Sequence, residues 1–221
     1  MEKQVKKAIK EEDLDKYFQG IALDIIDANL YLRLYQALLN SIEEHKEALT
    51  LSNIFWSYTL GSLYDAARMA LCRVYDSQPS SVNLCFLLGT IKKNLSLFTE
   101  ECFRKRLKDN PDVDSLAMSQ ITPSTEELDK DISSVFHKNN PTVSRLMKVR
   151  NNALAHRGVD ITLGEKAILE ELQELAAHAL NILNKYSTYF RASSYLMGVP
   201  GEDDYKVLLD LLKRGFHKRR E

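Results

Sequence analysis

Glycine, proline and cysteine are scarce in this sequence. Its 221 residues include 8 Gly, 5 Pro and 3 Cys. This composition excludes collagen-like and low-complexity chains, and 44% hydrophobic with 28% charged residues is typical of an ordinary globular protein. The cysteines, Cys72, Cys85 and Cys102, form no C-x-x-C pair, and each lies in an apolar helical context. The pattern therefore favours buried free thiols over a metal or redox site.

The sequence also lacks a long apolar run and an excess of one charge. No stretch approaches the roughly 18 uninterrupted apolar residues of a membrane helix. The first 18 residues are charged where a signal peptide would be apolar. Thirty basic and 31 acidic residues give a net charge of -1, so nothing in the overall charge favours general binding to nucleic acids or membranes. We expect a cytoplasmic protein without a membrane partner.

Helical spacing is present almost everywhere. Apolar residues recur at intervals of three and four, and no run alternates as a half-buried strand would. The sequence predicts an all-α bundle over residues 1–197, followed by a C-terminal amphipathic helix and basic tail over residues 198–221. The predicted helices span residues 13–47 with a break at Gly20, 52–75, 83–93, 96–108, 125–137, 142–157, 163–192 and 202–218, and residues 109–124 are predicted to form a loop.

The clearest boundaries belong to the predicted helix 142–157. Asn140 can cap its start and Gly158 supplies a stop. At about 100° per residue, Arg150 falls in the middle of the apolar stripe of this helix. A guanidinium there is costly unless it is paired with a neighbouring carboxylate or placed at an opening or a subunit interface. His156 lies in the last turn, where the helix dipole favours a cation.

The segment Arg150-Asn-Asn-Ala-Leu-Ala-His156 resembles the R-x(4-6)-H signature of HEPN domains. Five residues separate the arginine from the histidine, and the common asparagine follows the arginine. The upstream segments 53–60, 67–76 and 80–84 are similar to the AbiU-type branch of HEPN proteins, which is associated with bacterial abortive infection. The resemblance covers roughly residues 15–190 and leaves the C-terminal 30 residues outside.

The resemblance implies a HEPN-like helical bundle that forms a homodimer and acts as a metal-independent endoribonuclease, with the motif helices of two chains facing a shared cleft. His156 would exchange protons with the RNA 2′-hydroxyl and the departing 5′-oxygen, and Arg150 would bind the scissile phosphate. Asn151 would orient His156 or the phosphate by hydrogen bonding. Asn152 and Arg157 are candidate substrate-binding residues, and Arg157 alternatively completes the helix end.

The implied partners are RNA, a second copy of the chain, and an antitoxin or regulatory protein, with no cofactor and no metal. The implied role is in phage defence or as the toxin of a toxin–antitoxin system. Two other functions stay open. The chain is alternatively a catalytically inactive HEPN dimer that binds nucleotides or proteins. The helix C-terminus favours a protonated His156, and a protonated imidazole binds phosphate or donates a proton but cannot act as a base. It is otherwise a structural adaptor that uses the apolar stripe over residues 207–212.

Other residues have more ordinary interpretations. Arg73 and Asp76 can form a local ion pair with each other, or they can hold the Arg150 side chain in position. The basic residues 213–220 are predicted to be a solvated terminus rather than an RNA contact. The histidines at positions 45, 137, 178 and 217 receive no role. Four aromatic residues are predicted to pack in the core rather than to stack on RNA bases: Trp56, Tyr58, Tyr64 and Tyr75.

Overall fold

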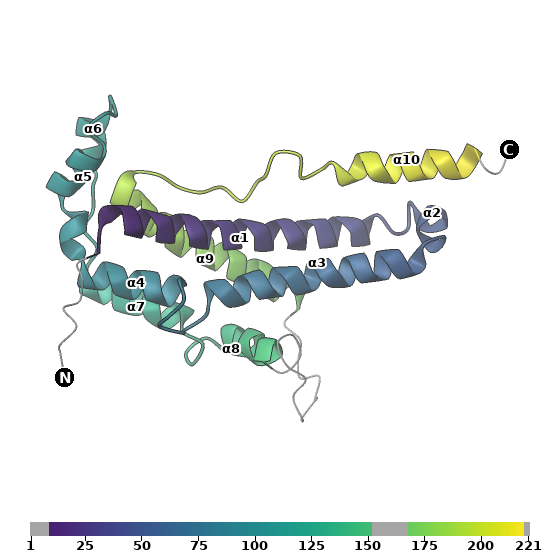
Figure 1. Cartoon of the computed structure of the whole chain (residues 1–221), viewed down its shortest axis with the longest axis horizontal. Helices are drawn as coiled ribbons and strands as arrows, with labels where there is room; N and C mark the ends of the chain where they lie inside the picture. The colour runs from purple at the N-terminus through teal and green to yellow at the C-terminus, as the bar shows by residue number, and fades with distance from the viewer. Residues whose placement is uncertain (1–8, 152–167, 219–221) are drawn as a thin grey trace.

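The computed structural model describes residues 9–151 and 168–218, and every regular element in these ranges is a helix. The predicted all-α class is confirmed. Figure 1 shows three long helices lying lengthwise against one another, with shorter helices at one end and below them. The long helices are α1 (Glu11–Asn40), α3 (Asn53–Val74) and α9 (Leu169–Arg191). None of the helices within these two ranges is long and apolar enough to cross a membrane.

Helix α1 runs through Gly20 without the predicted break. A glycine costs about 1 kcal/mol in a helix interior. Phe18 and Ile21, on either side of Gly20, are fully buried and hold this part of α1 against the core. The helix ends at Asn40, earlier than predicted, and a turn leads into the short helix α2 (Lys46–Thr50) at the tip of the α1–α3 hairpin.

Short elements connect α3 to the second half of the bundle. They are α4 (Leu84–Lys93), the 3-10 turn η1 (Leu95–Phe98), α5 (Glu100–Arg106), α6 (Val113–Met118) and α7 (Thr125–Val135). Ser124 caps α7, as predicted, by accepting a hydrogen bond from the backbone N–H of Glu127. Thr99 caps α5 in the same way and separates it from η1, where one helix over residues 96–108 was predicted. Helix α6 forms within residues 109–124, which were predicted to be a loop.

Helix α8 (Pro141–Val149) packs on α3 and α9. The side-chain oxygen of Asn140 accepts hydrogen bonds from the backbone N–H groups of Thr142 and Val143, which confirms the predicted cap. Arg150 and Asn151 continue the chain in a π-helical turn. The rest of the predicted helix 142–157, with its stop at Gly158, lies outside the described residues. Helix α9 begins at Leu169, later than predicted, because the backbone of Ile168 is extended.

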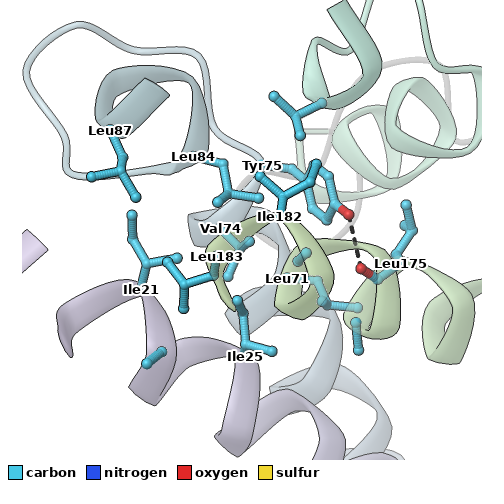
Figure 2. Packing of buried hydrophobic residues seen from close by; sticks show 14 of the residues in the cluster. Ile21, Ile25, Leu71, Val74, Tyr75, Leu84, Leu87, Leu175, Ile182 and Leu183 are labelled. Atoms are coloured by element: carbon cyan, nitrogen blue, oxygen red, sulfur yellow. Dashed lines mark hydrogen bonds between the residues drawn. The ribbon is translucent and has the colours of Figure 1, made fainter. Parts of the chain in front are cut away.

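The hydrophobic core lies where α1, α3, α4 and α9 meet. Side chains from all four helices point toward one another in Figure 2, and each buried one contributes roughly 1.5–3 kcal/mol of transfer free energy. The core residues labelled there are Ile21, Ile25, Leu71, Val74, Tyr75, Leu84, Leu87, Leu175, Ile182 and Leu183. This packing fixes the C-terminal end of α3, from which the candidate site is built. Tyr58, on the other half of α3, was predicted to be a core residue, and its 73% exposure corrects that prediction.

The C-terminal helix α10 (Tyr205–Lys218) runs along the second half of α1 and contacts α2 (Figure 1). Leu209 is buried, and Lys213 forms an ion pair with Glu44 at 3.1 Å. The apolar residues of the predicted stripe, Val207, Leu208, Leu211 and Leu212, are exposed. The division of the chain at residues 197 and 198 stays a prediction.

Candidate functional site

The motif arginine, Arg150, lies at the end of α8 against the turn that follows α3. Its Nη1 atom is 3.4 Å from Oδ1 of Asp76, and the two side chains are 23% and 18% exposed. Attraction between charges is stronger at such a half-buried position than in open solvent. A carboxylate from a neighbouring element therefore accounts for the guanidinium on the apolar stripe, which was one of the explanations left open by the sequence.

Asp76 is itself held in place by the backbone of its own turn. Its Oδ1 atom accepts hydrogen bonds from the backbone N–H groups of Ser77 at 2.8 Å and Gln78 at 3.3 Å. Side-chain oxygens of aspartate commonly close turns in this way. Because the carboxylate is fixed, it also restricts the position of the Arg150 guanidinium.

The predicted local pair between Arg73 and Asp76 is wrong. Arg73 instead binds Asp24 on α1, through Nε at 2.8 Å and Nη2 at 2.6 Å. Both hydrogen bonds are accepted by the same oxygen, Oδ1 of Asp24, and both join charged groups, which makes each of them stronger than a bond between neutral groups. Of the two residues suggested as support for Arg150, only Asp76 has that role.

Asn151 provides the second contact of the motif arginine. Its Oδ1 atom accepts a hydrogen bond from Nε of Arg150 at 3.0 Å. Within the described part of the chain, Asp76 and Asn151 are the side chains that bind this guanidinium. A guanidinium has five N–H donors, so these two contacts engage only part of its capacity.

The remaining predicted site residues lie outside the described residues. These are Asn152, His156 and Arg157. The structure brings together Arg150 and Asn151, and the roles of the other three stay predictions.

Cysteine chemistry does not contribute to the site. The Sγ atom of Cys72 on α3 contacts the carbonyl oxygen of Leu146 on α8 at 3.9 Å. Burial raises the pKa of the Cys72 thiol to about 12, against the opposing effect of Arg150 and Arg68. This thiol is therefore protonated and unreactive at neutral pH. Cys72 is buried as predicted, whereas Cys85 and Cys102 are half-buried. Among the described residues, no three His, Cys, Asp or Glu side chains are arranged to hold a metal ion.

The sequence did not predict a polar cluster formed by Tyr75, His178 and Ser134, of which Tyr75 is next to Asp76 in the chain. The Tyr75 hydroxyl donates to the carbonyl oxygen of Leu175 at 2.8 Å and lies 3.0 Å from Nδ1 of His178. The Nε2 atom of His178 lies 3.3 Å from the hydroxyl of Ser134. Burial lowers the pKa of His178, which favours its neutral form. The cluster joins the end of α3 to α7 and α9, and no local pattern links these distant positions in the sequence.

One comparison with known proteins gives a match. Residues 11–215 match the HEPN family model described as AbiU2. The match includes Arg150 and Asn151, and it extends into α10, beyond the residues 15–190 over which the resemblance was expected. No curated protein and no solved structure matches the chain.

Proposed function

Because the chain belongs to the AbiU2 family of HEPN domains, we propose that it is a metal-independent endoribonuclease. The proposed setting is phage defence by abortive infection, or a toxin–antitoxin system. The observation that carries the proposal is the placement of Arg150, whose guanidinium is oriented by Asp76 and Asn151 at the end of α8. The motif histidine, His156, follows six residues later in the sequence.

Arg150 is the proposed phosphate-binding residue. A guanidinium presents a planar fork of donors that matches two phosphate oxygens, and its charge stabilises negative charge that develops on them during the reaction. Asp76 and Asn151 restrict its orientation before RNA binds, which lowers the cost of ordering the side chain on binding. Asn151 is thus proposed as a positioning residue through its contact with Nε of Arg150.

His156 is the proposed acid and base. A neutral imidazole removes the proton of the RNA 2′-hydroxyl, whose oxygen attacks the adjacent phosphorus. The bond from phosphorus to the 5′-oxygen breaks, and the imidazolium returns a proton to this oxygen. The products are a 2′,3′-cyclic phosphate and a 5′-hydroxyl. Each proton transfer is worth roughly 10²- to 10⁴-fold in rate. Asn152 and Arg157 are proposed to contact the RNA.

A homodimer is the proposed active form. A two-fold axis places the same surface patch of each copy against the other, so the two motifs would lie in one cleft. RNA is the proposed substrate, and an antitoxin or regulatory protein is the proposed inhibitor.

Cleavage of a mixed RNA pool in EDTA by the purified protein tests this proposal. We expect the wild type to cut RNA and leave 2′,3′-cyclic phosphate ends, and Arg150→Ala and His156→Ala to reduce the rate at least about 100-fold. Arg145→Ala is the matched control, because Arg145 is a half-buried arginine on the same helix that pairs with Glu171 instead of Asp76. This control is expected to keep its activity.

The three variants distinguish the enzyme from the alternative. Equal loss in all three, including Arg145→Ala, would indicate damage to the fold rather than to the site. If the folded wild type cuts no RNA, even with infected-cell RNA as substrate, the endoribonuclease proposal is wrong. The catalytically inactive binding module is then the better account, and it predicts nucleotide or protein binding that His156→Ala does not affect.

A further inference from the structure

Two connections of the chain meet beside the candidate site. One is the turn after α3, residues 76–78, and the other is the α7–α8 loop, residues 136–140 (Figure 1). The hydroxyl of Ser77 in the turn lies 3.4 Å from Nδ1 of His137 in the loop. The residue before Ser77 holds the guanidinium of Arg150 through its carboxylate. Consecutive residues of one turn therefore hold the side chains of His137 and Arg150.

The α7–α8 loop is itself a hydrogen-bonded turn with His137 and Lys138 at its tip. The carbonyl oxygen of Phe136 accepts a hydrogen bond from the backbone N–H of Asn139 at 2.9 Å. The side-chain amide of Asn139 donates to α7, and the side chain of Asn140 caps α8. Because the loop is fixed on both sides, little conformational entropy is lost when its tip binds a ligand.

The charge around this loop is positive. The sequence contains no Asp or Glu from residue 132 to residue 159, and its lysines and arginines in this range are Lys138, Arg145, Lys148, Arg150 and Arg157. The carboxylate in the turn after α3 is already paired with Arg150. Since the whole chain has a net charge of -1, the excess of positive charge is local. A local positive surface favours an anionic ligand such as the phosphate backbone of RNA.

The two residues at the tip of the loop are available to such a ligand. Lys138 is exposed and forms no ion pair within the described ranges 9–151 and 168–218. His137 is half-buried, and its Nδ1 atom faces the hydroxyl of Ser77. When this hydroxyl donates to Nδ1, the proton of the neutral ring lies on Nε2. The Nε2 atom is then a donor for a phosphate oxygen.

We propose that His137 and Lys138 bind a second phosphate of the RNA strand whose scissile phosphate is held by Arg150. The Cα atoms of Asp76 and Ser77 are about 3.8 Å apart, so their short side chains hold Arg150 and His137 on the order of 10 Å from each other. A stacked strand covers this distance with about three nucleotides, at about 3.4 Å each. The inference rests on the proposed function, because it extends the phosphate-binding site along the substrate.

Binding of a labelled single-stranded RNA tests the inference without cleavage, if 2′-O-methyl groups replace the attacking hydroxyls. Fluorescence anisotropy is expected to show a dissociation constant about 5- to 10-fold higher for Lys138→Ala and for His137→Ala than for the wild type. Lys138→Ala is also expected to reduce the slope of log K against log salt concentration by about 0.7, the value for one phosphate of a single strand.

Lys148→Ala is the matched control for Lys138→Ala. Lys148 is also an exposed lysine of the acid-free range, but it lies two residues from Arg150 and so leaves α8 on roughly the opposite side. This control is expected to bind RNA within about 2-fold of the wild type, with an unchanged salt slope. Equal weakening by Lys138→Ala and Lys148→Ala, or wild-type affinity in Lys138→Ala, would overturn the inference.

The kinetics of RNA cleavage distinguish an RNA contact of His137 from a purely structural role. A side chain that binds the substrate and the transition state equally raises KM and leaves kcat unchanged when it is removed. His137→Ala is therefore expected to raise KM about 5- to 10-fold at the wild-type kcat. If kcat falls while KM stays the same, His137 only supports the turn that holds Arg150, and the proposed contact is wrong.

Ser77→Ala provides a second measurement that leaves the Arg150 contact in place. Alanine keeps the backbone N–H that binds Asp76 and removes only the hydroxyl that faces His137. We expect Ser77→Ala to weaken RNA binding about 2- to 3-fold in the wild type and to have no further effect in His137→Ala, because the two residues act through one contact. Additive effects would contradict this role of Ser77 in orienting His137.

These outcomes are separable from the test of the nuclease. A wild type that binds RNA through Lys138 and His137 but cuts none would refute the nuclease and leave the second phosphate contact standing. A wild type that cuts RNA, with Lys138→Ala and His137→Ala both equal to it in binding and in KM, would refute the contact alone. Failure of the wild type to bind single-stranded RNA would also refute the contact.

Discussion

The carboxylate of Asp76 lies 3.4 Å from the guanidinium of Arg150, and it joins the turn after α3 to the end of α8. The same carboxylate closes its own turn through the backbone of Ser77 and Gln78. Tyr75, its neighbour in sequence, is fixed to α9. The position of Arg150 is therefore set by the packing of three helices rather than by α8 alone.

Asp76→Asn is expected to reduce RNA cleavage about 10- to 100-fold, because the amide keeps an oxygen for the turn but no longer attracts Arg150. The free energy of unfolding is expected to change by less than about 1 kcal/mol. Initial cleavage rates and urea unfolding measure the two effects. Asp24→Asn is the control, since it removes the carboxylate that pairs with Arg73, away from the site. Wild-type rates in Asp76→Asn would show that this ion pair does not position Arg150.

The sequence predicted the helices well where the signals are local. Asn140 and Ser124 cap the helices that their side chains suggested, because capping depends only on the next three residues. Boundaries set by distant contacts were missed. Gly20 does not break α1 because the core holds the backbone on both sides of it, and α6 forms within a segment whose composition is that of a loop.

The site was predictable only in part for the same reason. The position of Arg150 on an apolar stripe showed that it needs a partner, and Asp76 was among the candidates. The choice between Asp76 and Asp24 as a partner for Arg73 depends on α1 lying beside α3, which no spacing within α3 reveals. Similarly, the spacing of apolar residues in α10 predicted a stripe over residues 207–212. It did not show that Leu209 alone within this range becomes buried.

Tyr75→Phe is expected to destabilise the fold by about 1–2 kcal/mol, because it leaves the buried carbonyl of Leu175 without its hydroxyl donor. Urea unfolding followed by circular dichroism measures the loss. Tyr205→Phe is the control, as Tyr205 contacts Lys206 through its ring and is not buried. Equal stability of Tyr75→Phe and the wild type would mean that the hydroxyl contributes nothing to the junction of α3 and α9.

The pH dependence of stability is expected to include a contribution from His178. Because burial lowers the pKa of His178 below its ordinary 6.5, the unfolded chain binds a proton more readily than the folded protein. The stabilising contribution is fully present above about pH 6.5 and falls as the pH drops toward the lower folded-state pKa. Thermal unfolding between about pH 7.5 and 5 is expected to show a flatter slope in His178→Gln than in the wild type. His137→Gln is the control variant and is expected to keep the wild-type slope. If His137→Gln flattens the slope as much as His178→Gln does, the pH dependence does not come from His178.

Docking of α10 is expected to depend on Leu209 rather than on the apolar residues around it. Replacing a buried leucine with alanine lowers the free energy of unfolding by about 2–5 kcal/mol. Two ion pairs also hold this part of the chain, Lys213 of α10 with Glu44, and Glu202 in the turn before α10 with Arg33. These are partly exposed ion pairs, which contribute little. Leu209→Ala is therefore expected to release α10 while the bundle stays folded, which hydrogen exchange would report as at least about 10-fold faster amide exchange over residues 205–218. Leu208→Ala alters a half-exposed neighbour and is expected to leave exchange unchanged. Equal exchange in the two variants would show that Leu209 is not the anchor.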